Sequence, residues 1–275
     1  MLAKRVAGGG DSANVTANPT RATFSEALPV LRVPGWDSFA GLAHGFLGRR
    51  GGTSTGAWST LNLSERVDDD PRAVARNWQV VRERFPDLRI ARMRQVHGDR
   101  VVQMDGHGEA EEADAMLTGS AGVGLAVLTA DCVPILMIAP AARAAMAVHA
   151  GWRGTVAGIA AKALDRAHRV LGLDPSHWYA SLGPSIGGCC YEVGSEIGEE
   201  LERRWGSMRR AWQAAGERGM LDLRMANRTI LIERGMAPER IVTVGPCTAC
   251  ASAEFFSHRR SRGSTGRQLS IVGWI

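Results

Sequence analysis

The feature of this sequence that most constrains its fold is residues 123–154, where two short apolar runs each end in a chemically capable residue. The first run leads to Asp131 and Cys132, and the second leads to His149. Continuous apolar runs of this length, bounded by Gly and Pro, are typical of strands buried on both faces. We therefore expect three central strands, over 123–129, 134–138 and 144–149.

Three roles for Cys132 and His149 follow from the residue types alone: metal ligands, a Cys–His nucleophilic pair, or ordinary core residues. Free cysteine is among the most buried residue types, which by itself favours the core. Asp131, Arg153 and the glycines beside the pair are poor core residues and good site residues. This neighbourhood makes the stretch the first candidate for a functional site.

The rest of the chain alternates helical and strand patterns. Asp70 and Pro71 are typical of a helix start, and the expected helices span 71–85, 155–171, 195–205 and 222–234. Further strands are expected at 101–104, 178–182, 241–244 and 268–272. The acidic segment 105–114 is expected to be a solvated loop. These patterns predict an α/β (α+β) fold in one domain over 26–275, with mixed sheets flanked by helices, after a disordered extension over 1–25.

Composition excludes several classes of protein. The net charge of +5 comes from scattered arginines without a basic stripe, so nucleic-acid binding is not expected. No apolar run reaches the roughly 18 residues that span a bilayer, so no membrane segment is expected. Five cysteines without regular spacing do not indicate a secreted disulfide framework, and the N-terminal segment lacks the apolar core expected of a signal peptide. The cytoplasm is the expected location.

A third candidate ligand, His97, lies in the segment Gln95-Val-His97-Gly. With Cys132 and His149 it makes two imidazoles and one thiolate, a set that suits zinc. Three protein ligands leave a fourth position for water or substrate, which is the catalytic arrangement. A zinc-free Cys132–His149 nucleophile and a purely structural role both stay open on the residues alone.

Two shorter patterns are set aside. Residues 183–187 fit the G-x-S-x-G nucleophile elbow, but the elbow must open into a helix, and Gly187-Gly188 follows instead. His107-Gly-Glu109 and Pro246-Cys247-x-x-Cys250 fit the letters of the zinc nucleobase deaminases, but they are too widely separated in sequence. We interpret Cys247 and Cys250 as small loop residues and not as a metal pair.

A dispersed set of motifs resembles the YfiH-like family, also labelled the multicopper polyphenol oxidase or laccase-domain family and the purine nucleoside phosphorylase family. The motifs occur in family order from about residue 40 to residue 272: HGFLGRRGG-TSTG, STLNL, DDPRAVARN, RQVHGDRV, EADAMLT, LTADCVPIL, AVHAGWRGTVAGI, LGPSIGGCCYEVG, DLRMANR and FFSHRR-(x)5-GR. ADCVP and HAGWRG are the most specific of them.

The resemblance implies a complex α/β domain, distantly similar to the catalytic domain of cytotoxic necrotizing factor toxins, with one zinc held by His97, Cys132 and His149. It implies phosphorolysis of adenosine, inosine, guanosine and methylthioadenosine, with accompanying adenosine deamination. An amidase-like editing of peptidoglycan precursors is an alternative. The copper-oxidase label fits poorly, because a laccase needs around ten histidine ligands and this chain has seven histidines in total.

For these reactions, nucleoside and phosphate are the expected small-molecule partners. Asp131 is the candidate either to shuttle a proton or to orient a ligand. Arg49, Arg153 and Arg260 are candidates to hold phosphate, because guanidinium groups match its oxygens. Asn62 is expected to hydrogen-bond the ribose or the base. The catalytic candidates are therefore Asp131, Cys132 and Arg153, and the turn that carries Arg153 is expected to form a wall of the pocket.

Overall fold

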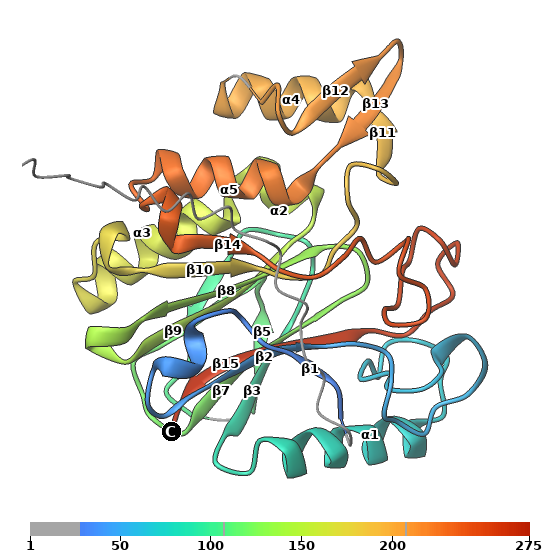
Figure 1. The fold of residues 1–275 in the computed structure, drawn as a ribbon, viewed down its shortest axis with the longest axis vertical. Helices are drawn as coiled ribbons and strands as arrows, with labels where there is room; N and C mark the ends of the chain where they lie inside the picture. The colour runs from blue at the N-terminus through green and yellow to red at the C-terminus, as the bar shows by residue number, and fades with distance from the viewer. Residues whose placement is uncertain (1–27, 107, 207) are drawn as a thin grey trace, which may run out of the picture.

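The computed structural model describes residues 28–106, 108–206 and 208–275. Two six-stranded sheets lie face to face, and helices cover their outer faces (Figure 1). The expected disordered extension over 1–25 lies outside the described residues.

The first sheet has mixed pairing. Its strands, in spatial order, are β1 (Val30–Leu31), β2 (Leu42–Leu47), β15 (Gln268–Trp274), β7 (Val123–Thr129), β3 (Arg89–Arg94) and β5 (Gly108–Glu112). Pairing is antiparallel from β1 to β7 and parallel from β7 to β5.

The second sheet is mixed as well. Its strands are β14 (Ile241–Thr243), β10 (Tyr179–Leu182), β8 (Val133–Ala139), β9 (Ala144–Ala150), β6 (Ala115–Thr118) and β4 (Val101–Gln103). The two outermost pairs are parallel and the inner pairs antiparallel. The predicted α/β class with mixed sheets is therefore confirmed.

Helices cover both sheets and a small lobe lies beyond them. The helices are α1 (Pro71–Arg84), α2 (Trp152–Ala157), α3 (Ile159–Leu171), α4 (Ser195–Trp205) and α5 (Leu223–Glu233). The small three-stranded sheet consists of β11 (Glu192–Gly194), β13 (Arg218–Leu221) and β12 (Trp212–Ala215). Short 3-10 helices occupy Trp36–Ser38, Gly56–Trp58, Pro140–Ala142, Pro175–His177 and Pro238–Arg240. None of the helices in the described ranges is long and apolar enough to cross a membrane.

Three clusters of buried side chains bind these layers together. One cluster fills the space between the two sheets, with Leu125 of β7 facing Leu136 of β8. A second packs the other face of β8 and β9 against α3 and α5. The third packs β15 and β2 against α1 through Trp78. Because β8 and β9 are covered on both faces, their apolar runs are continuous and do not alternate.

The expected helix over 155–171 is two helices. Gly158 adopts a left-handed conformation with φ 79° and separates α2 from α3. A Cβ at this position would lie 2.4 Å from Cζ2 of Trp205, so only glycine fits beneath that ring. The break lets α2 begin directly after β9, at Trp152.

The acidic segment expected to be a loop contains a strand. Residues 108–112 form β5, an exposed edge strand parallel to β3. Its acidic side chains pair with basic neighbours, since Glu112 lies 2.9 Å from Arg94 and Glu109 lies 3.3 Å from Arg66. Strand β3 was itself missed, because its alternating arginines conceal the period-two pattern of the buried Ala91 and Met93.

The stability of the fold should depend on pH through His44 of β2. This side chain is fully buried, and its Nε2 accepts a hydrogen bond of 3.1 Å from the backbone N–H of Val33. Burial, assisted by the charge of Arg32, lowers its pKa to about 4. Folded His44 therefore stays neutral at pH values where the unfolded residue binds a proton.

We expect the free energy of unfolding to fall by up to about 3 kcal/mol between pH 6.5 and pH 4 through this residue. His44→Gln should remove this contribution to the pH dependence of the free energy of unfolding, because glutamine can accept the same hydrogen bond without titrating. Urea unfolding of both proteins across this pH range measures the difference. If the free energy of unfolding depended on pH equally in the two proteins, His44 would not be the titrating group.

Candidate metal centre in an arginine-lined cavity

The three candidate metal ligands come together where the chain passes between the two sheets. Segment 130–132 connects β7 of the first sheet to β8 of the second and carries Cys132. Segment 95–100 likewise passes from the first sheet to the second, connecting β3 to β4, and carries His97. His149 lies near the end of β9, paired with Pro134 of β8. Sheet topology therefore brings together three residues that are far apart in sequence.

The three ligand atoms lie within 4.8 Å of one another. The imidazole rings of His97 and His149 meet edge to face, with centroids 4.9 Å apart. His149 is buried, Cys132 is half-buried and His97 is exposed, so the group opens to one side. A Cβ on Gly151 would lie 3.0 Å from the Cys132 sulfur and 3.1 Å from His97, so the glycine keeps this space free.

A buried carboxylate, Asp114, holds the ligand segments in place. Its Oδ1 lies 2.7 Å from Nδ1 of His149 and accepts a hydrogen bond from the backbone N–H of His97. Its Oδ2 accepts bonds from the N–H groups of Val96 and Gly98. Because Nδ1 of His149 is engaged, Nε2 is left to face Cys132.

The imidazoles make Cys132 acidic. Burial alone would raise the pKa of this thiol, but the charge and hydrogen bonds of His149 and His97 lower it to about 6. Burial likewise opposes the charge on His149, while Cys132 and Asp114 raise the pKa of its imidazole to about 9. The thiolate form needed for a ligand or a nucleophile is therefore present at neutral pH.

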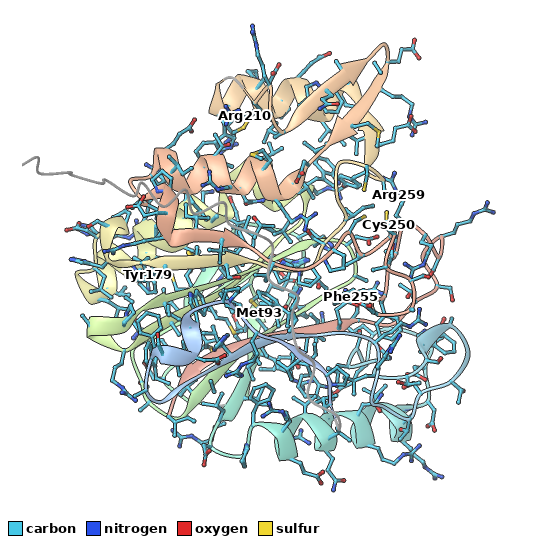
Figure 2. All side chains as sticks on the ribbon, in the orientation of Figure 1. Met93, Tyr179, Arg210, Cys250, Phe255 and Arg259 are labelled. Carbon is cyan, nitrogen blue, oxygen red and sulfur yellow. The ribbon has the colours of Figure 1, made fainter. Side chains whose placement is uncertain are left out.

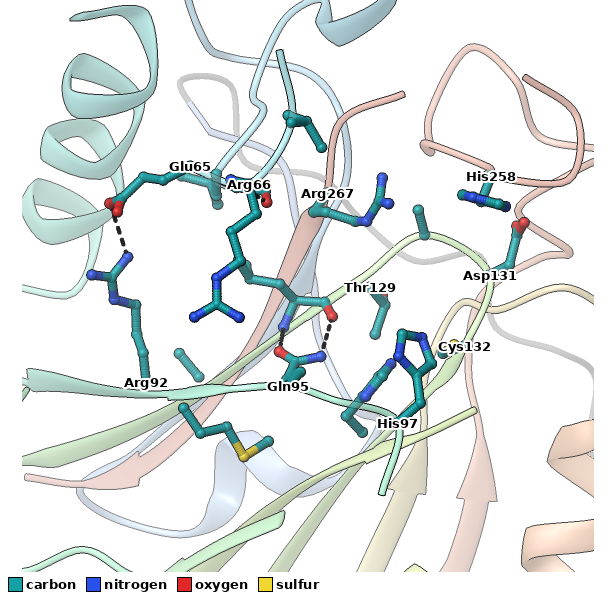
Figure 3. A pocket seen from close by; sticks show the side chains of 18 of the residues that line it. Glu65, Arg66, Arg92, Gln95, His97, Thr129, Asp131, Cys132, His258 and Arg267 are labelled. Carbon is teal, nitrogen blue, oxygen red and sulfur yellow. Dashed lines mark hydrogen bonds and ion pairs between the residues drawn. The ribbon is translucent and has the colours of Figure 1, made fainter. Parts of the chain in front are cut away.

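Asp131 has a different task from the one expected for it. Its two carboxylate oxygens accept hydrogen bonds of 2.7 Å from the Thr248 hydroxyl and from the backbone N–H of Arg259. In Figure 3 the carboxylate points away from Cys132, toward His258. The backbone of Asp131 is left-handed, with φ 98°, a conformation that is costly outside glycine and common at functional sites. Asp114, and not Asp131, contacts a ligand imidazole.

The trio lies in a cavity of about 590 Å³ that Arg153 also lines, from the first turn of α2 and not from the expected separate turn. This volume is in the usual range for small-molecule sites. Figure 3 shows part of its lining. Aromatic walls come from Trp152 and Tyr191, and the basic residues of the lining besides His97 and His149 are Arg66, Arg92, Arg153, His258, Arg259 and Arg267.

Two of these arginines are candidates to bind an anion. Arg153 is exposed, stacks on the ring of Trp152 at 4.3 Å, and forms no hydrogen bond or ion pair with any residue that the structure describes. Arg267 is half-buried and donates from one nitrogen, Nη1, to the carbonyls of Thr265 and Gly266. Burial lowers the pKa of Arg267, whereas Cys132 and Asp131 oppose that effect.

The three other expected substrate residues do not line the cavity. Arg49 and Arg260 donate to backbone carbonyl groups and so tie loops together. Asn62 is fully buried, and its side-chain oxygen Oδ1 accepts a hydrogen bond of 2.9 Å from the backbone N–H of Arg267. Its contact with the site is therefore indirect, through the backbone of Arg267.

Sequence analysis missed Asp114 and Arg267. Each immediately precedes a buried strand, Asp114 before β6 and Arg267 before β15. A charged residue directly beside an apolar run is a signal that was available in the sequence. It was hidden for Asp114 by the acidic segment around it and for Arg267 by the many other arginines nearby.

Comparison with known proteins identifies the family. The model of the family described as multi-copper polyphenol oxidoreductase laccase matches residues 43–275. The purine nucleoside phosphorylase YlmD of Geobacillus stearothermophilus is 37% identical over 249 residues, covering 86% of this chain and 91% of the relative. A purine nucleoside phosphorylase of Deinococcus radiodurans is 38% identical over 248 residues, covering 90% of this chain and 93% of the relative.

Solved structures agree with this result. The crystal structure of YlmD from Geobacillus stearothermophilus superposes with a TM-score of 0.85 at 34% identity, covering 92% of this chain and 97% of that one. The hypothetical protein YfiH of Bacillus licheniformis gives a TM-score of 0.82 at 28% identity, covering 91% and 97%. The chain belongs to the YfiH-like family.

The position of Asp114 generates a test of the metal centre. Asp114→Asn should weaken the binding of zinc, used as the probe ion, by about 10- to 100-fold, because the amide no longer fixes the tautomer of His149. Competition with a chromophoric chelator measures the affinity. Asp105→Asn makes the same substitution at an exposed carboxylate and serves as the control, which should bind zinc normally. An unchanged affinity in Asp114→Asn would contradict the orienting role.

Proposed function

We propose that the chain is a zinc-dependent purine nucleoside phosphorylase that accepts adenosine, inosine, guanosine and methylthioadenosine and also deaminates adenosine. One observation carries the proposal: His97, Cys132 and His149 converge in a cavity that also presents arginines. The name of the relatives, purine nucleoside phosphorylase, supports the same reaction. We further propose that residues 26–275 act as one catalytic unit in the cytoplasm.

The donor set fits zinc. Two imidazole nitrogens and one thiolate are preferred zinc ligands, and three protein ligands leave one position open. Asp114 engages Nδ1 of His149, which leaves Nε2 for an ion, as in carboxylate–histidine–zinc arrangements. An ion held by these residues supplies Lewis acidity beside the substrate.

Phosphate binding is assigned to Arg153 and Arg267. Both line the cavity, and Arg153 has an uncommitted planar fork of donors that matches phosphate oxygens. Arg267 is oriented by the carbonyls that Nη1 contacts, so the rest of its guanidinium is preorganised for a ligand. Together they place two positive charges where an anionic nucleophile must be held.

The nucleoside would occupy the space between the metal ligands and the aromatic wall. Tyr191 and Trp152 line this space and offer aromatic faces on which a purine can stack. Asp131 enters the proposal as a positioning residue, because its carboxylate holds the backbone of Arg259 at the cavity wall. This role has more support than the expected proton transfer, since Asp131 already accepts two hydrogen bonds.

Incubation of the protein with inosine and phosphate should release hypoxanthine and ribose 1-phosphate. His97→Ala and Cys132→Ala should each abolish this product and lower the metal content by about one zinc per chain, because each removes a ligand. His168→Ala, at an exposed histidine on α3, should leave both quantities unchanged. Chromatography of the products and elemental analysis measure the two effects. Turnover that survives complete metal removal would contradict the zinc proposal, and copper at the site would contradict the metal assigned.

Arg153→Ala should raise the KM for phosphate by about 10-fold or more, since a charge-assisted hydrogen bond contributes about 1.5–3 kcal/mol. Arg153→Lys should recover only part of this loss, because an ammonium group lacks the planar fork. The matched control is Arg169→Ala, which removes an exposed arginine of α3 outside the cavity. Steady-state kinetics at varied phosphate distinguish the variants. A KM unaffected by Arg153→Ala would exclude this residue from phosphate binding.

A second candidate function rests on the arrangement of Cys132, His149 and Asp114, in which the imidazole of His149 contacts both other side chains. With the thiol pKa near 6 and Asp114 orienting the imidazole, the three groups have the roles of a cysteine hydrolase triad. This chemistry would suit the amidase-like editing of peptidoglycan precursors, and the expected similarity to cytotoxic necrotizing factors stays a prediction. Amide cleavage by the metal-free protein, blocked by alkylation of Cys132, would favour this function over phosphorolysis.

A further inference from the structure

Four of the five cysteines of the chain gather in one group outside the cavity. Cys189 and Cys190 lie between β10 and β11, and Cys247 and Cys250 follow β14. All four sulfur atoms lie within 4.8 Å of one another. None of these residues lines the cavity that contains His97, Cys132 and His149.

The sulfur separations match a shared ion and not a disulfide. The Sγ atom of Cys250 lies 3.4 Å from that of Cys190 and 3.8 Å from that of Cys189. A disulfide bond is only about 2.0 Å long. Thiolates arranged tetrahedrally around zinc, with bonds of about 2.3 Å, stand about 3.8 Å apart.

Backbone groups already hold one sulfur as a ligand would be held. The N–H of Gly187 lies 3.2 Å from the Cys247 sulfur, and the backbone N–H groups of Ala249 and Cys250 also point to it. Donors of this kind around a ligand fix its orientation and stabilise its negative charge.

Metal binding would require the thiolate form of all four side chains, whose sulfur atoms lie within 4.8 Å of one another. Several thiolates cannot share so small a volume without a compensating positive charge. A divalent ion that prefers sulfur satisfies this requirement, and four thiolates complete its tetrahedral shell.

We propose that Cys189, Cys190, Cys247 and Cys250 bind a second, structural zinc ion. The sequence analysis interpreted Cys247 and Cys250 as small loop residues because no partner pair was evident. The fold supplies that pair from residues 189–190, about sixty positions earlier. This site is independent of the proposed function and of the ion assigned to His97, Cys132 and His149.

The position of the cluster explains what such an ion would do. It would join the loop after β10 to the loop after β14, and both loops reach the cavity. Tyr191, next to Cys190, lines the cavity, and Thr248, next to Cys247, donates to Asp131. Figure 2 places Cys250 and Arg259 in the same region of the molecule. The second zinc would therefore hold one wall of the active site in place.

Elemental analysis of protein purified under reducing conditions should find about two zinc ions per chain. Cys132→Ser should lose one of them, Cys190→Ser/Cys250→Ser should lose the other, and the combined variant should bind none. Cobalt loaded into Cys132→Ser should show the intense thiolate charge-transfer absorption of a four-sulfur site. One zinc in the wild-type protein, retained in Cys190→Ser/Cys250→Ser, would overturn the proposal.

X-ray absorption on zinc-loaded Cys132→Ser keeps the test decisive if the double cysteine variant fails to fold. We expect four sulfur neighbours at about 2.3 Å. Nitrogen or oxygen neighbours would overturn the four-cysteine site, and iron in place of zinc would overturn the metal assignment. A mass lower by two hydrogens, found in the denatured and chelated wild-type chain, would show a disulfide instead and also overturn the proposal. Because Cys132 is absent from the sample used for X-ray absorption, failure of the proposed phosphorolysis cannot produce the sulfur neighbours measured there.

Discussion

The carboxylate of Asp114 is the interaction on which the site depends. It is fully excluded from solvent and makes four contacts, one with the imidazole of His149 and three with backbone N–H groups of residues 96–98. These contacts join the end of β9 to the crossover that carries His97. A buried carboxylate is costly unless it is fully hydrogen-bonded, so the surrounding chain has little freedom to rearrange. The geometry of two of the three candidate metal ligands thus follows from one side chain.

Local pattern was sufficient to predict much of the fold and to select His97, Cys132 and His149 as candidate ligands, which the structure brings within 4.8 Å of one another. The strands around Cys132 and His149 were predictable because both faces of β7 and β8 are covered, which leaves continuous apolar runs in the sequence. The start of α1 was predictable because Asp70 caps it through the N–H of Arg72. These signals depend only on neighbours within a few positions. The break at Gly158 was not predictable, because it depends on Trp205 from a distant helix.

The roles of the arginines illustrate the limit of sequence analysis most clearly. Arg49 and Arg153 both lie in glycine-rich segments and have the same side chain, yet Arg49 is committed to backbone carbonyls and Arg153 is not. Which carbonyls are free to bind a guanidinium depends on how loops distant in sequence pack. Charge and motif therefore predicted that arginines lie near the site. Only the tertiary structure separated the arginines that are free to bind a ligand from those that hold loops together.

The five cysteines divide into two environments that suit different tasks. Cys132 is accompanied by two imidazoles and opens into a cavity, so an ion there keeps a position for substrate. The other four cysteines surround one point with sulfur alone, so an ion there would have no free position and would act only by connecting loops. The hydrogen bond from Thr248 to Asp131 links the two regions. An ion at the four-cysteine group would thus restrict the motion of the crossover that carries Asp131 and Cys132, through the hydrogen bond from Thr248.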